Sequence, residues 1–115
     1  MAVTDLTVRA SRVDDRTELI ALAGELDLYS VDAFRAALED ALTLEPERVV
    51  VDASDVAFID SVALGVLANA MKQQRARGGT IVLVATNPNI VRVFEITGLD
   101  RMLVIADSLD DALTA

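Results

Sequence analysis

The chain has 115 residues, a length that fits one domain of typical size. Hydrophobic residues make up 53% of it, enough for a folded core, and the formal net charge of −9 disfavours binding to nucleic-acid phosphates. Cysteine and histidine are absent, which excludes disulfides, thiolate metal sites, cysteine nucleophiles and Ser-His-Asp hydrolases. We therefore expect a binding protein that is not an enzyme and has no catalytic residues, metal or cofactor of its own.

The apolar runs of the sequence are short. The run Ile81–Ala85, for example, is far below the roughly 18 residues that a membrane-spanning helix needs. Residues 1–12 carry Asp5 and alternate in polarity, so we do not expect a signal peptide there. The expected location is the cytoplasm, without membrane insertion and without direct contact to nucleic acid.

The first predicted elements form a hairpin. Apolar and polar residues alternate from Leu6 to Ser11, which is typical of a half-buried strand, and an extended apolar run follows over residues 18–22. A turn over residues 13–16 joins the two strands. The segment Gly24–Asp27 is expected to end the second one.

A helix is expected next, with Ser30 as its N-cap and Pro46 as its stop. Five apolar residues share one face of this helix: Val31, Phe34, Leu38, Ala41 and Leu42.

The second half of the chain continues the alternation of strands and helices. The expected elements are a strand over 48–52, a loop over 53–60, a helix from Ser61 to about Arg77, a strand over 81–85, a helix from Pro88 to Gly98, a strand over 102–105 and a helix opened by Ser108. The long helix should bury a stripe of small and apolar residues: Ala63, Val66, Leu67, Ala70 and Met71.

This order predicts the fold class. Alternating strands and helices give an α/β fold, a mostly parallel sheet with an N-terminal hairpin strand, flanked by about four helices. No linker, repeat or low-complexity segment interrupts the pattern, so we expect a single domain over residues 1–115.

Two segments are candidates for a functional site. The first is Gly24–Asp27 together with Ser30, and the second is Phe58–Ser61. Each lies where a strand leads into the start of a helix. In an open parallel sheet, this edge is where ligands bind.

Four carboxylates lie at strand ends or in the following loops: Asp27, Asp52, Asp55 and Asp60. They could form a Mg²⁺ pocket or serve ordinary turns and caps, and the second role is the more frequent. A receiver domain with Asp52 as phosphoryl acceptor would also need a lysine after its last strand. The only lysine, Lys72, falls within a predicted helix, which excludes that class.

Ser61 has two alternative roles. It could cap the helix that follows, the more common role for such a serine, which contributes about 1 kcal/mol. It could also accept a phosphoryl group, because positions 62–64 are Val, Ala and Leu and supply no acidic side chain for a capping box. The N–H groups and dipole of the first turn would favour the added phosphate.

Four motifs then point to a known family. They are GELDLYSVDAF (residues 24–34), VVVDASDVAFIDSVALGVL (49–67), RGGTIVLV (77–84) and ITGLDRML (96–103). In this order and spacing they resemble the STAS domain of bacterial anti-sigma factor antagonists. The resemblance extends over about residues 6–113 and implies that this range is the core of a single STAS domain.

The resemblance implies a phosphorylation switch. In that family, the serine after the Asp of the pattern DS-x-G-L-G is phosphorylated by an anti-sigma factor that is itself a serine kinase, and a metal-dependent serine phosphatase removes the phosphate. The matching residue is Ser61. Unphosphorylated antagonist binds the kinase and releases the sigma factor, while ATP and Mg²⁺ are bound by the kinase.

The implied partner-binding residues are Asp27, Asp60, Ser61 and Val62. Val62 stands where the family usually has Ser or Thr, and Ala63 where it usually has Gly. The alternative is a STAS domain that binds constitutively, as a subunit of a lipid-transport complex or of a stress-signalling scaffold. Ser61 would then only cap its helix.

Overall fold

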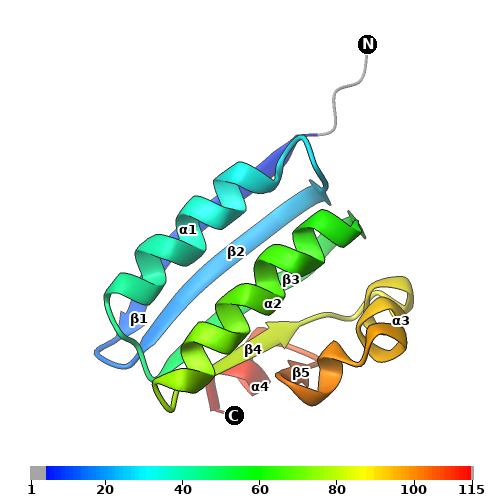
Figure 1. The fold of residues 1–115 in the computed structure, drawn as a ribbon. Helices are drawn as coiled ribbons and strands as arrows, with labels where there is room; N and C mark the ends of the chain where they lie inside the picture. The colour runs from blue at the N-terminus through cyan, green and yellow to red at the C-terminus, as the bar shows by residue number, and fades with distance from the viewer. Residues whose placement is uncertain (1–4, 115) are drawn as a thin grey trace.

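The computed structural model describes residues 5–114, in which strands and helices alternate as predicted (Figure 1). The elements are β1 (Leu6–Asp14), β2 (Thr17–Leu26), α1 (Val31–Thr43), β3 (Arg48–Ile59), α2 (Ser61–Ala76), β4 (Thr80–Val84), α3 (Pro88–Thr97), a 3-10 helix η1 (Leu99–Arg101), β5 (Val104–Ala106) and α4 (Leu109–Thr114). The single domain expected over 1–115 also includes residues 1–4 and 115, which lie outside the described residues.

The strands form one sheet in the order β1-β2-β3-β4-β5. β1 pairs with β2 in the antiparallel sense, and every later pair is parallel. The predicted hairpin and the predicted parallel sheet are therefore confirmed.

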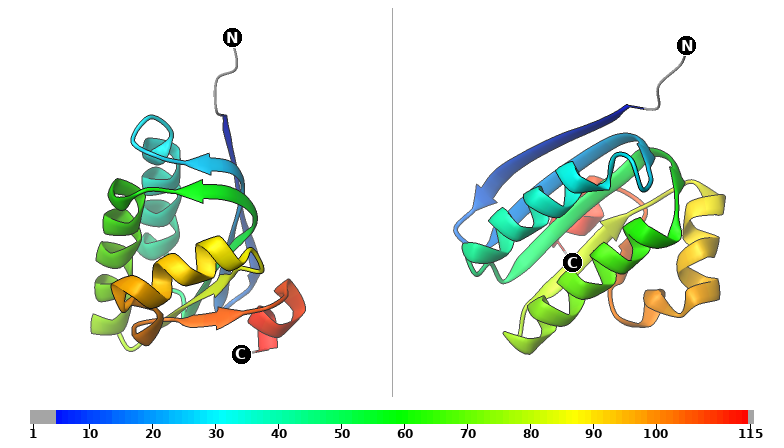
Figure 2. Two further views of the ribbon diagram at one scale, coloured as in Figure 1. Left: turned by 90° about the vertical axis from the view of Figure 1, so that its right-hand side faces the viewer. Right: turned by 45° about the horizontal axis from the view of Figure 1, so that its top comes forward.

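Helices cover both faces of this sheet, as Figure 2 shows. α1 and α2 lie side by side on one face, above the larger core, and α3 adds Ile90 and Phe94 to the same core. α4 lies on the other face, where Ala112 packs with Val50 and Val82 in a smaller core. Among the described residues, no helix has the length and apolar character needed to cross a membrane.

The two long helices bury the faces that their spacing predicts, with two exceptions in α2. One expected residue is not fully buried, and one residue that was not expected is buried. All five residues expected on the inner face of α1 are buried. In α2 the expected residues Ala63, Leu67, Ala70 and Met71 are buried, whereas Val66 is only half-buried. Gln74 is buried as well, although the predicted apolar stripe did not include this polar residue.

Hydrogen bonds explain why Gln74 can be buried. Its Nε2 donates to the carbonyl oxygen of Pro46 at 2.8 Å and to that of Thr80 at 3.2 Å. Its Oε1 accepts from the guanidinium of Arg77. The side chain thus joins the end of α2 to the segment before β3 and to the start of β4.

β2 ends at Leu26, within the segment expected to end it, but β3 is longer than predicted, and the loop expected over residues 53–60 is wrong. β3 continues to Ile59 because β2 continues beside it to Leu26. The parallel register of the pair shifts twice, between Ala21 and Ala23 and between Gly24 and Glu25. β4 stops pairing at Asp52, so the last part of β3 has a strand on one side only and carries exposed polar residues that imitate a loop.

The end of the chain also differs in detail from the expectation. The last strand was expected over 102–105 and lies at Val104–Ala106, after the 3-10 helix. The N-cap expected at the last helix is present, since the Oγ of Ser108 accepts the N–H of Asp111 at 3.1 Å.

Candidate functional site

The structure brings the two candidate segments together at the carboxyl ends of β2 and β3. Leu26 and Ile59 are partners in the parallel pairing of these strands. The N–H of Asp60 then donates to the carbonyl oxygen of Leu26 at 3.1 Å. The loop between β2 and α1 therefore lies directly beside the start of α2.

Asp60 holds these two segments in place. Its backbone is extended, with φ −103° and ψ 178°, and its Oδ1 accepts the N–H of Ala63 at 3.0 Å, which makes it the N-cap of α2. Its Oδ2 accepts the N–H of Leu28 at 2.9 Å. One carboxylate therefore satisfies a free N–H group of the helix and fixes the neighbouring loop.

Ser61 is not the N-cap of α2, so that alternative is wrong. An N-cap residue has a non-helical backbone, and here that residue is Asp60, whereas Ser61 is the first residue inside the helix. Its side chain is exposed, and its hydroxyl makes no hydrogen bond among residues 5–114. The serine hydroxyl is thus free for chemistry.

The loop from Asp27 to Ser30 is shaped by its own side chains. The Oδ1 of Asp27 accepts the N–H groups of Tyr29 at 2.9 Å and Ser30 at 3.1 Å. The Oγ of Ser30 donates to the carbonyl oxygen of Glu25 at 2.8 Å and accepts the N–H of Asp27 at 3.0 Å. Ser30 occupies the N-cap position of α1 without capping it through its side chain. The Asp27 residue is half-buried, and its carboxylate already accepts hydrogen bonds within the loop. Its contact with a partner stays a prediction.

Four large apolar residues that are close to Ser61 in the chain, or lie in the loop that Asp60 holds, are exposed, and we call them the apolar rim. They are Tyr29 (91% exposed), Leu28 (58%), Phe58 (48%) and Val62 (37%). Val62 was among the predicted partner-binding residues and Phe58 was part of a candidate segment, whereas Leu28 and Tyr29 were not predicted from the sequence. Large apolar side chains that are exposed together mark interaction surfaces, and aromatic residues often carry most of the binding energy there. The sequence did offer one signal for Leu28 and Tyr29. Two large apolar residues stand between the turn-forming residues Asp27 and Ser30, where burial is not expected.

The four carboxylates considered for a Mg²⁺ pocket are not gathered in one place. In the described part of the chain, no three acidic side chains lie close enough together to hold a metal ion. The Oδ1 of Asp52 accepts the N–H of Ser54 at 3.1 Å and its hydroxyl at 2.6 Å. Asp60 directly precedes the serine and Asp27 lies in the loop that Asp60 holds, and each carboxylate fixes backbone N–H groups.

Comparison with known proteins identifies the family. Residues 9–112 match the family model described as the STAS domain. The chain belongs to the STAS domain family.

Relatives of this STAS domain chain carry consistent names. It is 36% identical over 86 residues to the anti-sigma-B factor antagonist of Listeria monocytogenes, and the match covers 75% of each chain. A crystal structure of an anti-sigma factor antagonist from Mycobacterium paratuberculosis superposes with a TM-score of 0.86 at 30% identity, covering 95% of this chain and 92% of that one. SpoIIAA of Bacillus in its phosphorylated form gives a TM-score of 0.75 at 25% identity, covering 94% and 97%. The fold and family predicted from the sequence are both confirmed.

Proposed function

We propose that this STAS domain is an anti-sigma factor antagonist that binds an anti-sigma factor through the apolar rim and Ser61. The observation that carries the proposal is an exposed serine hydroxyl that begins α2, next to Asp60, which holds a neighbouring loop with exposed apolar residues. The names of the relatives support the same function. In this role the chain is a binding partner and a kinase substrate in the cytoplasm, and it performs no catalysis.

Phosphorylation of Ser61 is the proposed switch. The partner kinase binds ATP and Mg²⁺ and transfers the γ-phosphoryl group to the Oγ of Ser61, which loses its proton while ADP leaves. Within residues 5–114, the hydroxyl has no hydrogen bond that this reaction would break. A metal-dependent serine phosphatase would restore the free hydroxyl by hydrolysis.

The added phosphate would release the partner for two physical reasons. It carries about −1.5 to −2 charges at neutral pH and would lie next to the carboxylate of Asp60. It would also place a strongly hydrated group among Leu28, Tyr29 and Val62, whose binding depends on removal of water. The helix itself tolerates the charge, because an anion at a helix N-terminus is stabilised.

The test combines binding with phosphorylation. Each anti-sigma factor of the same genome is purified and titrated against the parent protein, Ser61→Ala and Ser61→Asp by calorimetry. The parent and Ser61→Ala should bind one of them, and Ser61→Asp should bind at least about tenfold more weakly, since its single charge imitates part of the phosphate. With ATP and Mg²⁺, mass spectrometry should find phosphate on the parent at residue 61 and none on Ser61→Ala.

Other results would assign a different function. Equal binding by all three proteins, with no phosphate on Ser61, would support a constitutive interaction subunit in place of the switch. Absence of binding to every anti-sigma factor would overturn the antagonist function itself.

A further inference from the structure

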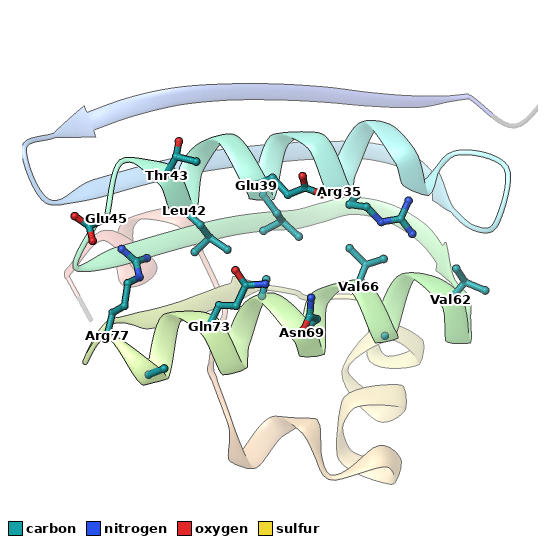
Figure 3. A pocket seen from close by; sticks show the side chains of 14 residues that line it. Arg35, Glu39, Leu42, Thr43, Glu45, Val62, Val66, Asn69, Gln73 and Arg77 are labelled. Atoms are coloured by element: carbon teal, nitrogen blue, oxygen red, sulfur yellow. The ribbon is translucent and has the colours of Figure 1, made fainter.

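A groove runs between α1 and α2 and starts at the proposed binding surface. Its volume is about 1120 Å³, and Val62, a member of the apolar rim, lines its first part (Figure 3). Leu38 and Leu42 of α1 and Val66 and Ala70 of α2 supply apolar lining. The groove therefore continues the apolar surface around Ser61 along the length of both helices.

The charged residues that line the groove sum to zero net charge, so they do not favour a partner of either sign. Four charged side chains line it, Arg35 and Arg77 against Glu39 and Glu45, so that the signs balance. Arg35 is also paired with Asp32 of its own helix. Shape and apolar contact remain as the properties that a partner must match.

Gly65 is the unusual residue of this groove. It lies one helical turn after Ser61, is exposed, and lines the groove. Glycine in the interior of a helix is disfavoured relative to alanine. Its backbone has no positive φ, and a Cβ added there would meet nothing within 4 Å. The fold of the chain itself thus gives no reason for a glycine at this position.

The other four glycines each have a reason inside the chain. Three of them, Gly24, Gly78 and Gly98, have a positive φ. At the fourth, Gly79, an added Cβ would meet the buried side chain of Gln74. Gly65 differs from all of them. A partner molecule that packs closely against the backbone of α2 at this position would explain why the residue is a glycine.

We propose that Gly65 is a specificity-determining contact, over which an apolar helix of the anti-sigma factor packs against the backbone of α2 in the α1–α2 groove. The inference rests on the proposed function, because it extends the surface around Ser61 to a second region of the same partner. Close helix packing requires small residues at the point of contact, and glycine allows the closest approach. The occupant is the anti-sigma factor because Val62 belongs both to the groove and to the apolar rim.

The experiment adds side-chain volume at Gly65 and measures stability and binding separately. Gly65→Ala and Gly65→Leu are titrated by calorimetry with the purified anti-sigma factor that binds the parent protein, and their melting temperatures are recorded. Gly65→Ala should melt at or above the temperature of the parent, because its Cβ meets nothing within 4 Å and alanine favours the helix, and Gly65→Leu should remain folded. Gly65→Leu should bind about tenfold or more weakly, with Gly65→Ala between it and the parent.

Ala36→Leu is the matched control. Ala36 is also a small, exposed helical residue, but it lies on α1 outside the groove. It should bind like the parent. If Gly65→Leu binds like the parent while Ser61→Asp loses binding, this inference is overturned and the proposed function stands. If the parent binds no anti-sigma factor, both fail. A parent dimer in sedimentation that Gly65→Leu converts to a monomer would assign the groove to a second copy and overturn the inference.

Discussion

The Oδ2 of Asp60 accepts the N–H of Leu28 at 2.9 Å, although the two residues are 32 positions apart in the chain. The Oδ1 of the same carboxylate caps α2. This carboxylate therefore links the loop that holds Leu28 and Tyr29 to the start of α2. Substitutions of Asp60 can separate its two roles.

Asp60→Asn should keep the cap and lose the tie to Leu28. Asparagine caps helices about as well as aspartate, but its second terminal atom is an N–H donor that cannot accept the N–H of Leu28. We expect amide exchange of Leu28, measured by NMR, to accelerate and binding to the anti-sigma factor to weaken. Asp60→Ala loses both bonds and should cost about 1–2 kcal/mol in the free energy of unfolding.

Ser108→Ala controls for the loss of a cap as such. It removes the cap of α4 on the opposite face of the sheet and should cost about 0.5–1 kcal/mol without affecting binding. Slow exchange of Leu28 in Asp60→Asn would contradict the role of the Oδ2.

Ser61→Ala should leave the free energy of unfolding within about 0.5 kcal/mol of the parent value. Its hydroxyl caps nothing, and alanine is favourable inside a helix. Urea unfolding of Ser61→Ala beside Asp60→Ala checks this directly. Equal losses in the two variants would mean that the serine shares the capping role.

Tyr29→Ala should weaken binding to the anti-sigma factor by about 1–2 kcal/mol and leave stability nearly unchanged. The side chain is 91% exposed and buries little within the chain. Val13→Ser is the control: Val13 is also an exposed apolar residue, but it lies beside the turn between β1 and β2, whereas Tyr29 follows the other end of β2. If both variants bind equally well in calorimetry, the apolar rim is not the binding surface.

Gly79→Ala should lower the free energy of unfolding by about 1–3 kcal/mol. The added Cβ would lie 2.4 Å from the Nε2 of Gln74, which its bonds to Pro46 and Thr80 hold in place. Chemical unfolding of Gly79→Ala, Gln74→Ala and the double variant provides the test. The double variant should lose less than the two single losses added together, because the clash disappears with the Gln74 side chain. Additive losses would show that the two residues do not interact.

Local patterns in the sequence were sufficient to predict the buried face of α1 and the bounds of α3. The inner face of α1 and the bounds of α3, with Pro88 at its start and Gly98 after its end, follow from periodicity and from the backbone preferences of proline and glycine. The end of β3 could not be predicted in this way. Its polar residues follow from the absence of β4 beyond Asp52, which is a property of the sheet as a whole.

The site was predictable in its place but not in its details. Asp60 and Ser61 are both good capping residues, and the choice between them depends on which backbone is extended. Exposure of Leu28, Tyr29 and Phe58 depends on how two strands end side by side, and the turn-forming neighbours of Leu28 and Tyr29 were a local signal for those two residues only. The burial of Gln74 likewise requires carbonyl groups from two distant segments.

The strand order of the sheet has a consequence for synthesis of the chain. Since strand order follows chain order, each new strand pairs with the strand made just before it, and none has to be inserted between two others. The side-chain hydrogen bonds described above that join Asp27, Ser30 and Asp60 to the backbone near Ser61 all involve residues before position 64. The chain leaves the ribosome from its N-terminus, so these groups emerge before β4 does, and the remaining residues add the strands and helices that stabilise them.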